Sequence, residues 1–244
     1  MSPRVTLATA RRVGRQLRRD RRTLALVLVV PPALLALLDY VFDARPQTFD
    51  RIGAPLVGVF PLILMFLVTS IAMLRERSTG TLERLMSMPM AKLDLLLGYG
   101  LAFAVVGALQ AGVTAGVAFG LLGVETAGPV WAVVCLAIAN AILGMALGLF
   151  LSAFATSEFQ AVQFMPAFIL PQLLLAGLFA PREIMPEALQ TISDALPFTY
   201  AYDALAKVAA DDVDGRLWLD VGVLAGCIVL ALAVGALTLR RRTP

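Results

Sequence analysis

The stretch GAPLVGVFPLILMFLVTSIAML (53–74) runs directly into RERSTGTLERLMSMPMAKLD (75–94), the most charged interval between two long apolar runs of this chain. A helix needs about 20 residues to cross the ~30 Å hydrocarbon core of a bilayer. Residues 53–74 provide that length without a charged side chain, whereas the apolar stripe of 75–94 is too short to span. We therefore expect a membrane helix that ends in a compact amphipathic loop.

The rest of the chain has the composition of a membrane protein. Of its 244 residues, 59% are hydrophobic and only 15% are charged, whereas soluble domains are near half apolar and a quarter charged. We predict an all-α protein with six transmembrane helices in residues 23–244. The predicted spans are 23–38 continuing to 42, 53–74, 95–122, one helix within 126–157, 159–181 and 221–239.

The distribution of basic residues predicts the orientation of these spans. Six spans place both termini on one side. That side carries eight arginines before residue 23, four basic residues in 75–94 and three arginines at 240–242, against five basic residues in the opposite loops. The positive-inside rule makes that side cytoplasmic, in a bacterial plasma membrane. Residues 1–22 are predicted to form an amphipathic helix touching anionic lipid, and the run after them to be an uncleaved first helix.

Residues 181–210 form an apolar loop on the predicted outer side. Pro186 suits the first turn of a short helix, and Pro197 ends it. A second short helix is expected over 198–208. Segments of this length are usually re-entrant or interfacial, so we predict an external re-entrant helical hairpin. The acidic run DDVDG at 211–215 has no role that the sequence explains.

Residues 75–94 are predicted to contain a short helix along the inner membrane face. Thr79 or Thr81 can cap its start, and Glu83 suits the positive end of the helix dipole. Apolar side chains recur at helical spacing at Leu82, Leu85, Met86 and Pro89. Such a helix either rests on lipid or docks in a groove of a partner protein. An ordinary solvated, capped turn is the plain alternative.

Two motifs in these segments resemble one transporter family. The pattern E-x-x-x-G-T-L-E with a later proline is similar to the first cytoplasmic loop of ATP-binding-cassette type-2 exporter permeases; it comprises Glu76, Gly80, Thr81, Leu82, Glu83 and Pro89. The stretch FAPREIMPEALQTISDALPFTYAYDAL resembles the external hairpin of that family through Pro186, Pro197, Thr199 and Tyr200. Many members have Gly-Lys at the head of the third span, where this chain has Gly98-Tyr99.

The resemblance implies that the 75–94 loop is a coupling helix, which inserts into a separate ATPase subunit. It also implies a second permease, as a homodimer or a related heterodimer, with the cargo route between the two. Spans two and five would line that route, and the candidate residues are Phe164, Met165, Phe168 and Gln172. For Thr199 and Tyr200, a turn with an interfacial tyrosine remains an alternative reading.

Other functions lack the residues they require. No G-x-x-x-x-G-K-[ST] loop is present, so we expect ATP and Mg²⁺ to bind the partner and no cofactor to bind this chain. The chain has no histidine and two cysteines within apolar runs, which argues against zinc and serine-type membrane proteases. The span centres have no ionisable residue, which argues against proton-coupled transport. The arginine-rich start is read as a topology anchor, with no nucleic acid partner.

We therefore predict a permease subunit, itself no enzyme, that exports an amphipathic drug, lipid or glycan-like substrate using ATP hydrolysed elsewhere. The alternatives are a membrane scaffold or immunity component that binds an ATPase without moving cargo, and an ion-coupled secondary transporter. The glycine pair 144–148 and the glycine series 112–116–120 have the four-residue spacing that lets helices approach closely, which predicts a packed bundle.

Overall fold

The computed structural model describes residues 2–86 and 91–238, and within these residues the chain is all-α. The helices are α1 (Pro3–Arg19), α2 (Arg21–Val41), α3 (Pro46–Ser78), α4 (Thr81–Met86), α5 (Lys92–Gly120), α6 (Val130–Leu151), α7 (Glu158–Phe164), a π-helical turn η1 (Met165–Ile169), α8 (Leu170–Leu175), a 3₁₀ turn η2 (Arg182–Ile184), α9 (Glu187–Asp194), α10 (Pro197–Ala209) and α11 (Gly215–Thr238).

Five helices of the described chain are long and apolar enough to cross a membrane, namely α2, α3, α5, α6 and α11. They correspond to five of the six predicted spans, all but 159–181. Their ends differ in places, and α3 begins at Pro46, inside the segment expected to be a loop. Large apolar side chains cover their outer faces, and Leu26, Val105 and Val229 are each more than 60% exposed. Such faces suit contact with lipid, because hydrocarbon gives them no reason to bury further.

The predicted span 159–181 is not one regular helix. Helical structure runs from Glu158 to Leu175 but passes through α7, the π-turn η1 and α8 in succession. Pro166 and Pro171 stand at the starts of η1 and α8. Proline has no N–H to donate and its ring crowds the preceding turn, so the helix departs from regular geometry there.

The centre of the bundle is the contact of α3 with α6. A Cβ added at Gly144 would lie 2.0 Å from the carbonyl oxygen of Leu62, and one at Gly148 would lie 2.4 Å from that of Phe66. Glycine at these two positions therefore lets the two backbones touch. A Cβ added at Gly112, Gly116 or Gly120 would have no atom of another described element within 4 Å. Close packing is confirmed for the α6 pair, and the α5 series faces outward.

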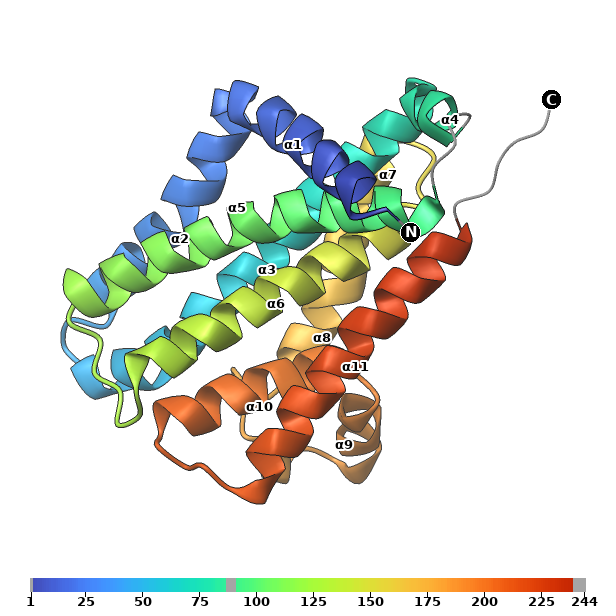
Figure 1. Cartoon of the computed structure of the whole chain (residues 1–244). Coiled ribbons are helices and arrows are strands. Elements are labelled where there is room, and N and C mark those ends of the chain that lie inside the picture. The colour runs from blue at the N-terminus through green and yellow to red at the C-terminus, as the bar shows by residue number, and fades with distance from the viewer. Residues whose placement is uncertain (1, 87–90, 239–244) are drawn as a thin grey trace.

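The short elements gather at the two ends of the bundle (Figure 1). The start of the chain, α1, α4 and α7 lie at one end, where α11 also finishes, and α9 and α10 lie at the other. Here α1 lies across the beginning of α5, the helix with which it packs most extensively. The helix bundle thus separates two sets of candidate functional residues.

Candidate functional site

The turn between α3 and α4 holds the residues predicted to couple to an ATPase. Gly80 has φ of 70°, a conformation that favours glycine; it ends the continuation of α3, and α4 starts at the next residue, Thr81. Leu82 is buried against the end of the bundle, whereas Glu83 is exposed. The helix is therefore anchored by one face and presents the other, as the amphipathic spacing predicts.

The remaining predicted coupling residues have different surroundings. Leu85 is half-buried beside the same cluster as Leu82. Pro89 lies outside the described residues, as does the side chain of Met86. Neither threonine caps α4 through a described hydrogen bond to its backbone; the Thr79 hydroxyl instead lies 2.8 Å from the Arg75 carbonyl oxygen, to which it donates.

Glu76 faces into the protein, away from the surface that α4 presents. Its side chain is only 6% exposed, and Oε1 lies 3.4 Å from Nη2 of Arg12 on α1. The same Arg12 nitrogen donates to the hydroxyl of Tyr99 on α5, and the guanidinium carbon lies 5.6 Å from the Tyr99 ring centroid. Tyr99 is buried. Arg12, Glu76 and Tyr99 thus join α1, α3 and α5.

A second set of contacts holds α1 on α5. The backbone N–H of Ser2 lies 3.1 Å from both carboxylate oxygens of Asp94, and the Thr6 hydroxyl lies 3.4 Å from one of them. A Cβ at Gly98 would lie 2.5 Å from the Cβ of Thr9, so only glycine permits this approach. The pair Gly98-Tyr99, which departs from the family pattern in sequence, thus contacts α1 through both of its residues.

Arg75, the neighbour of Glu76, points to a different helix. Its Nε and Nη2 donate to the two carboxylate oxygens of Glu158 at 2.8 Å and 3.0 Å. Glu158 is the first residue of α7, whose start is capped by the Ser157 hydroxyl. This ion pair joins the end of α3 to the irregular helix 158–175, and the sequence reasoning did not foresee it.

The four residues predicted to line a cargo route divide into two kinds. Phe164, Met165 and Phe168 are half-buried around the π-turn. Gln172 is 1% exposed: its amide nitrogen donates to the Phe168 carbonyl at 2.9 Å, and its amide oxygen lies 3.4 Å from the backbone nitrogen of Phe198. In this conformation Gln172 therefore links the irregular helix to α10.

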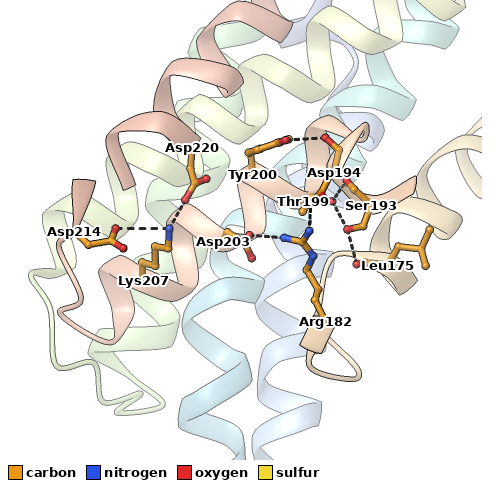
Figure 2. A network of polar contacts seen from close by, with 10 residues as sticks. All are labelled: Leu175, Arg182, Ser193, Asp194, Thr199, Tyr200, Asp203, Lys207, Asp214 and Asp220. Carbon is orange, nitrogen blue, oxygen red and sulfur yellow. Dashed lines mark hydrogen bonds and ion pairs between the residues drawn. The ribbon is translucent and has the colours of Figure 1, made fainter. Parts of the chain in front are cut away.

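The hairpin residues at the other end form one hydrogen-bonded unit (Figure 2). Pro186 immediately precedes α9, and Pro197, predicted to end that helix, is the first residue of α10. The Thr199 hydroxyl lies 2.7 Å from the Ser193 carbonyl oxygen, and the Ser193 hydroxyl donates to the Leu175 carbonyl at 2.9 Å. The Tyr200 hydroxyl donates to the Asp194 carbonyl at 2.7 Å. Thr199 and Tyr200 therefore fix the angle between α9 and α10.

Charged side chains surround this unit (Figure 2). Arg182 pairs with Asp194 and, at 3.0 Å, with Asp203. Burial raises the pKa of the Asp203 carboxyl above its ordinary value, and the nearby Arg182 guanidinium opposes that shift. Lys207 pairs with Asp220 at 2.6 Å, and this aspartate is almost fully buried at the start of α11.

The acidic run after the hairpin has a structural role that the sequence did not reveal. Asp214 accepts a hydrogen bond from the backbone N–H of Leu217 at 2.8 Å and lies 3.7 Å from Lys207. It therefore caps the first turn of α11. Residues of the hairpin, of the starts of α3 and α11 and of the loop before α6 line an open cavity of about 990 Å³.

Comparison with known proteins adds a separate line of evidence. Residues 4–209 match the family described as ABC-2 type transporter. The chain is 26% identical over 168 residues to a linearmycin resistance permease protein of Bacillus subtilis, a match covering 68% of this chain and 43% of that protein. It is 24% identical over 175 residues to a probable multidrug ABC transporter permease of Escherichia coli, covering 72% and 45%. Nodulation protein J of Rhizobium leguminosarum is 28% identical over 174 residues, covering 69% and 64%.

Proposed function

We propose that this chain carries out the transport step of an ATP-driven exporter, because it belongs to the ABC-2 type transporter family and is a membrane permease component. Its cargo is an amphipathic drug, lipid or glycan-like molecule, moved outward across a bacterial plasma membrane. The names of two relatives support this class, since one is a probable multidrug permease and the other a linearmycin resistance permease. The matches span less than half the length of those two relatives, so the cargo is a proposal about this chain alone.

The proposal includes six spans, with residues 158–175 as the fifth in chain order. At 1.5 Å rise per residue this segment reaches about 27 Å, close to the ~30 Å hydrocarbon thickness. An even number of spans agrees with the arrangement in Figure 1, where α1, α4 and the finish of α11 share one end. Fifteen of the twenty basic residues fall in the segments 1–22, 75–94 and 240–242, which the sequence predicts to share one side. We therefore assign that side to the cytoplasm.

The end assignments give roles to the short helices. On the cytoplasmic side α1 lies in the membrane interface, with Arg15 and Arg19 exposed to anionic headgroups. On the outer side α9 and α10 form the re-entrant hairpin. Its backbone is helical, which satisfies the hydrogen-bonding demand of a segment near membrane depth.

The single observation that carries the proposal is the geometry of the coupling turn. α4 follows α3 through Gly80, precedes α5, buries Leu82 and exposes Glu83. A rigid element between two long helices moves both when a partner pushes it. The partner is a cytoplasmic ABC ATPase subunit that holds ATP and Mg²⁺, and a second permease copy or relative completes the transporter.

Gly80 offers a sharp test with a matched control. Gly80→Ala forces a side chain into a left-handed conformation, with nothing within 4 Å to clash. Gly123→Ala does the same at the opposite end, where φ is 67° and the space is equally open. Each substitution costs roughly 1 kcal/mol of backbone strain, so the two variants differ in location alone.

The measurement is transport in proteoliposomes made with the co-purifying ATPase, using a fluorescent phospholipid and a lipophilic cationic dye as cargo probes. We expect Gly80→Ala to lower transport per ATP hydrolysed several-fold, Gly80→Asn to restore much of it, and Gly123→Ala to leave it unchanged. Equal losses at both glycines would contradict the coupling role. Hydrolysis without movement of either probe would favour the scaffold or immunity alternative.

A further inference from the structure

Two neighbouring residues in the last turn of α3 hold two different parts of the protein. Successive helical residues point about 100° apart, so Arg75 faces α7 while Glu76 faces α1 and α5. We propose that Arg12, Arg75, Glu76, Tyr99 and Glu158 form a two-sided clamp. The clamp transmits displacement of the coupling turn to α1 and α5 on one side and to the irregular helix 158–175 on the other. This inference rests on the proposed function. The five residues of the clamp are positioning residues.

The inner side of the clamp is built on a buried charge. Glu76 is 6% exposed in its side chain and its ionic partner is Arg12, whose guanidinium also contacts Tyr99. Separating a buried carboxylate from its cation leaves that charge uncompensated at high cost. Consequently α1 and α5 have to follow α3 when the coupling turn moves, and α1 acts as part of the moving body.

This inner junction also has spare hydrogen-bonding capacity. Among the described residues, Oε2 of Glu76 and Nε of Arg12 are buried and have no hydrogen-bond partner. The 3.4 Å separation of the bonded pair is longer than a charge-assisted hydrogen bond prefers. A small rotation of α1 over α5 can therefore tighten the pair without breaking it, so this junction can adjust as the transporter changes state.

The outer side of the clamp is the Arg75–Glu158 ion pair, which contributes less to stability than the buried Glu76 junction but has a well-defined geometry. Arg75 and Glu158 are 57% and 52% exposed in their side chains, and exposed ion pairs add little to stability. Their two parallel hydrogen bonds nevertheless fix the distance and angle between α3 and α7. Breaking this pair should therefore affect movement more than folding.

The outer side leads to the part of the bundle best suited to change shape. Glu158 begins α7, and about two turns later the chain enters the π-turn Met165–Ile169. π-Turns and internal prolines weaken the regular ladder of helix hydrogen bonds and are frequent at functional sites. Phe164, Met165 and Phe168 lie half-buried around this turn. The clamp therefore connects the coupling turn to the predicted cargo route.

The test uses the complete permease with its co-purifying ATPase and needs no knowledge of the cargo. Spin labels are placed at Phe159→Cys on α7, beside the clamp, and at Trp131→Cys in the first turn of α6. Both native side chains are about 70% exposed. Cys135 and Cys227 are first replaced by serine. Pulsed electron resonance then gives the label-to-label distance with and without a non-hydrolysable ATP analogue.

In the otherwise native protein we expect the distance distribution to shift by a few ångströms when the analogue binds. Arg75→Glu should abolish the shift, and Arg75→Glu combined with Glu158→Arg should restore most of it. Restoration will be partial, because arginine at the start of α7 opposes the helix dipole. Glu183→Arg, a charge reversal at the exposed outer end, should leave the shift unchanged.

The outcomes separate the clamp from the proposed function. A shift that persists in Arg75→Glu, or no shift in the native background, overturns the clamp while ATPase binding still supports the permease assignment. Loss of the shift that the charge swap fails to restore likewise overturns an ion-pair mechanism. Failure of any ATPase to bind the native chain removes the proposed function, and the clamp falls with it.

Discussion

Replacing Gly144 by alanine tests the closest helix contact of the bundle. The added Cβ would lie 2.0 Å from the carbonyl oxygen of Leu62 and 2.9 Å from its Cα. Both are backbone atoms, so no side chain can rotate to make room. The contact can reach a normal distance only if α3 and α6 separate by roughly 1 Å, a gap that forfeits a quarter to a half of each affected dispersion contact.

The expected magnitude follows from two opposing effects. Overpacking a well-packed interface costs about 1–3 kcal/mol, and a backbone obstacle places Gly144→Ala near the upper end. Alanine also favours the helix over glycine by about 1 kcal/mol. Gly116→Ala and Gly226→Ala gain the same propensity in open surroundings, with nothing within 4 Å. Comparing Gly144→Ala with these two controls therefore isolates the clash.

The assay is thermal unfolding of the purified protein in detergent, followed by size-exclusion chromatography with fluorescence detection. At roughly 2–4 °C per kcal/mol for a chain of this size, the midpoint of Gly144→Ala should fall about 6–12 °C below those of the two controls. If all three midpoints agree within error, α3 and α6 do not touch at Gly144, and the packing described for the centre of the bundle is incorrect.

Three further changes probe the ends of the bundle. Asp20→Ala removes the carboxylate that caps the start of α2 by accepting from Thr23, and it should cost about 0.5–2 kcal/mol. Because hydrogen bonds from Thr23 lower the pKa of Asp20, this stabilisation is complete above the unfolded-state pKa of about 3.9 and is lost as pH falls through the lower folded-state pKa. The melting midpoints of the native protein and the variant should therefore converge between pH 6 and pH 3. Asp220→Asn removes the nearer carboxylate from Lys207 and leaves it the more distant Asp214, 3.7 Å away, so it should destabilise by up to about 3 kcal/mol. Adding Lys207→Met should recover much of that loss, and no recovery in unfolding assays would mean that the pair is not coupled. Thr199→Val breaks a buried hydrogen bond and should cost about 1–3 kcal/mol. Tyr200→Phe removes an exposed hydrogen bond and should cost less than about 1.5 kcal/mol. A melting midpoint lower for Tyr200→Phe than for Thr199→Val would contradict the hairpin geometry.

Local features of the sequence determined the broad architecture. Apolar runs predicted the long helices because the length of an apolar run can be counted directly from the sequence. Pro186 and Pro197 marked helix boundaries in the hairpin because the backbone constraints of proline act within a few residues. The same kind of reasoning placed helix ends less well. α3 begins inside a predicted loop, and helix 158–175 stops before the predicted boundary.

The tertiary structure decided which side chains meet across long separations in the chain. Gly144 and Gly116 belong to glycine series of the same spacing, yet only Gly144 contacts another backbone. Glu76 belonged to a surface motif by its pattern, but the position of α1 turns it toward Arg12. Hydropathy and spacing define the faces of one helix, whereas the rotation and crossing of neighbouring helices determine which faces touch. The sequence by itself therefore specified five long apolar helices and the short amphipathic helix that follows the second of them, and only the packed bundle specified the contacts that connect them.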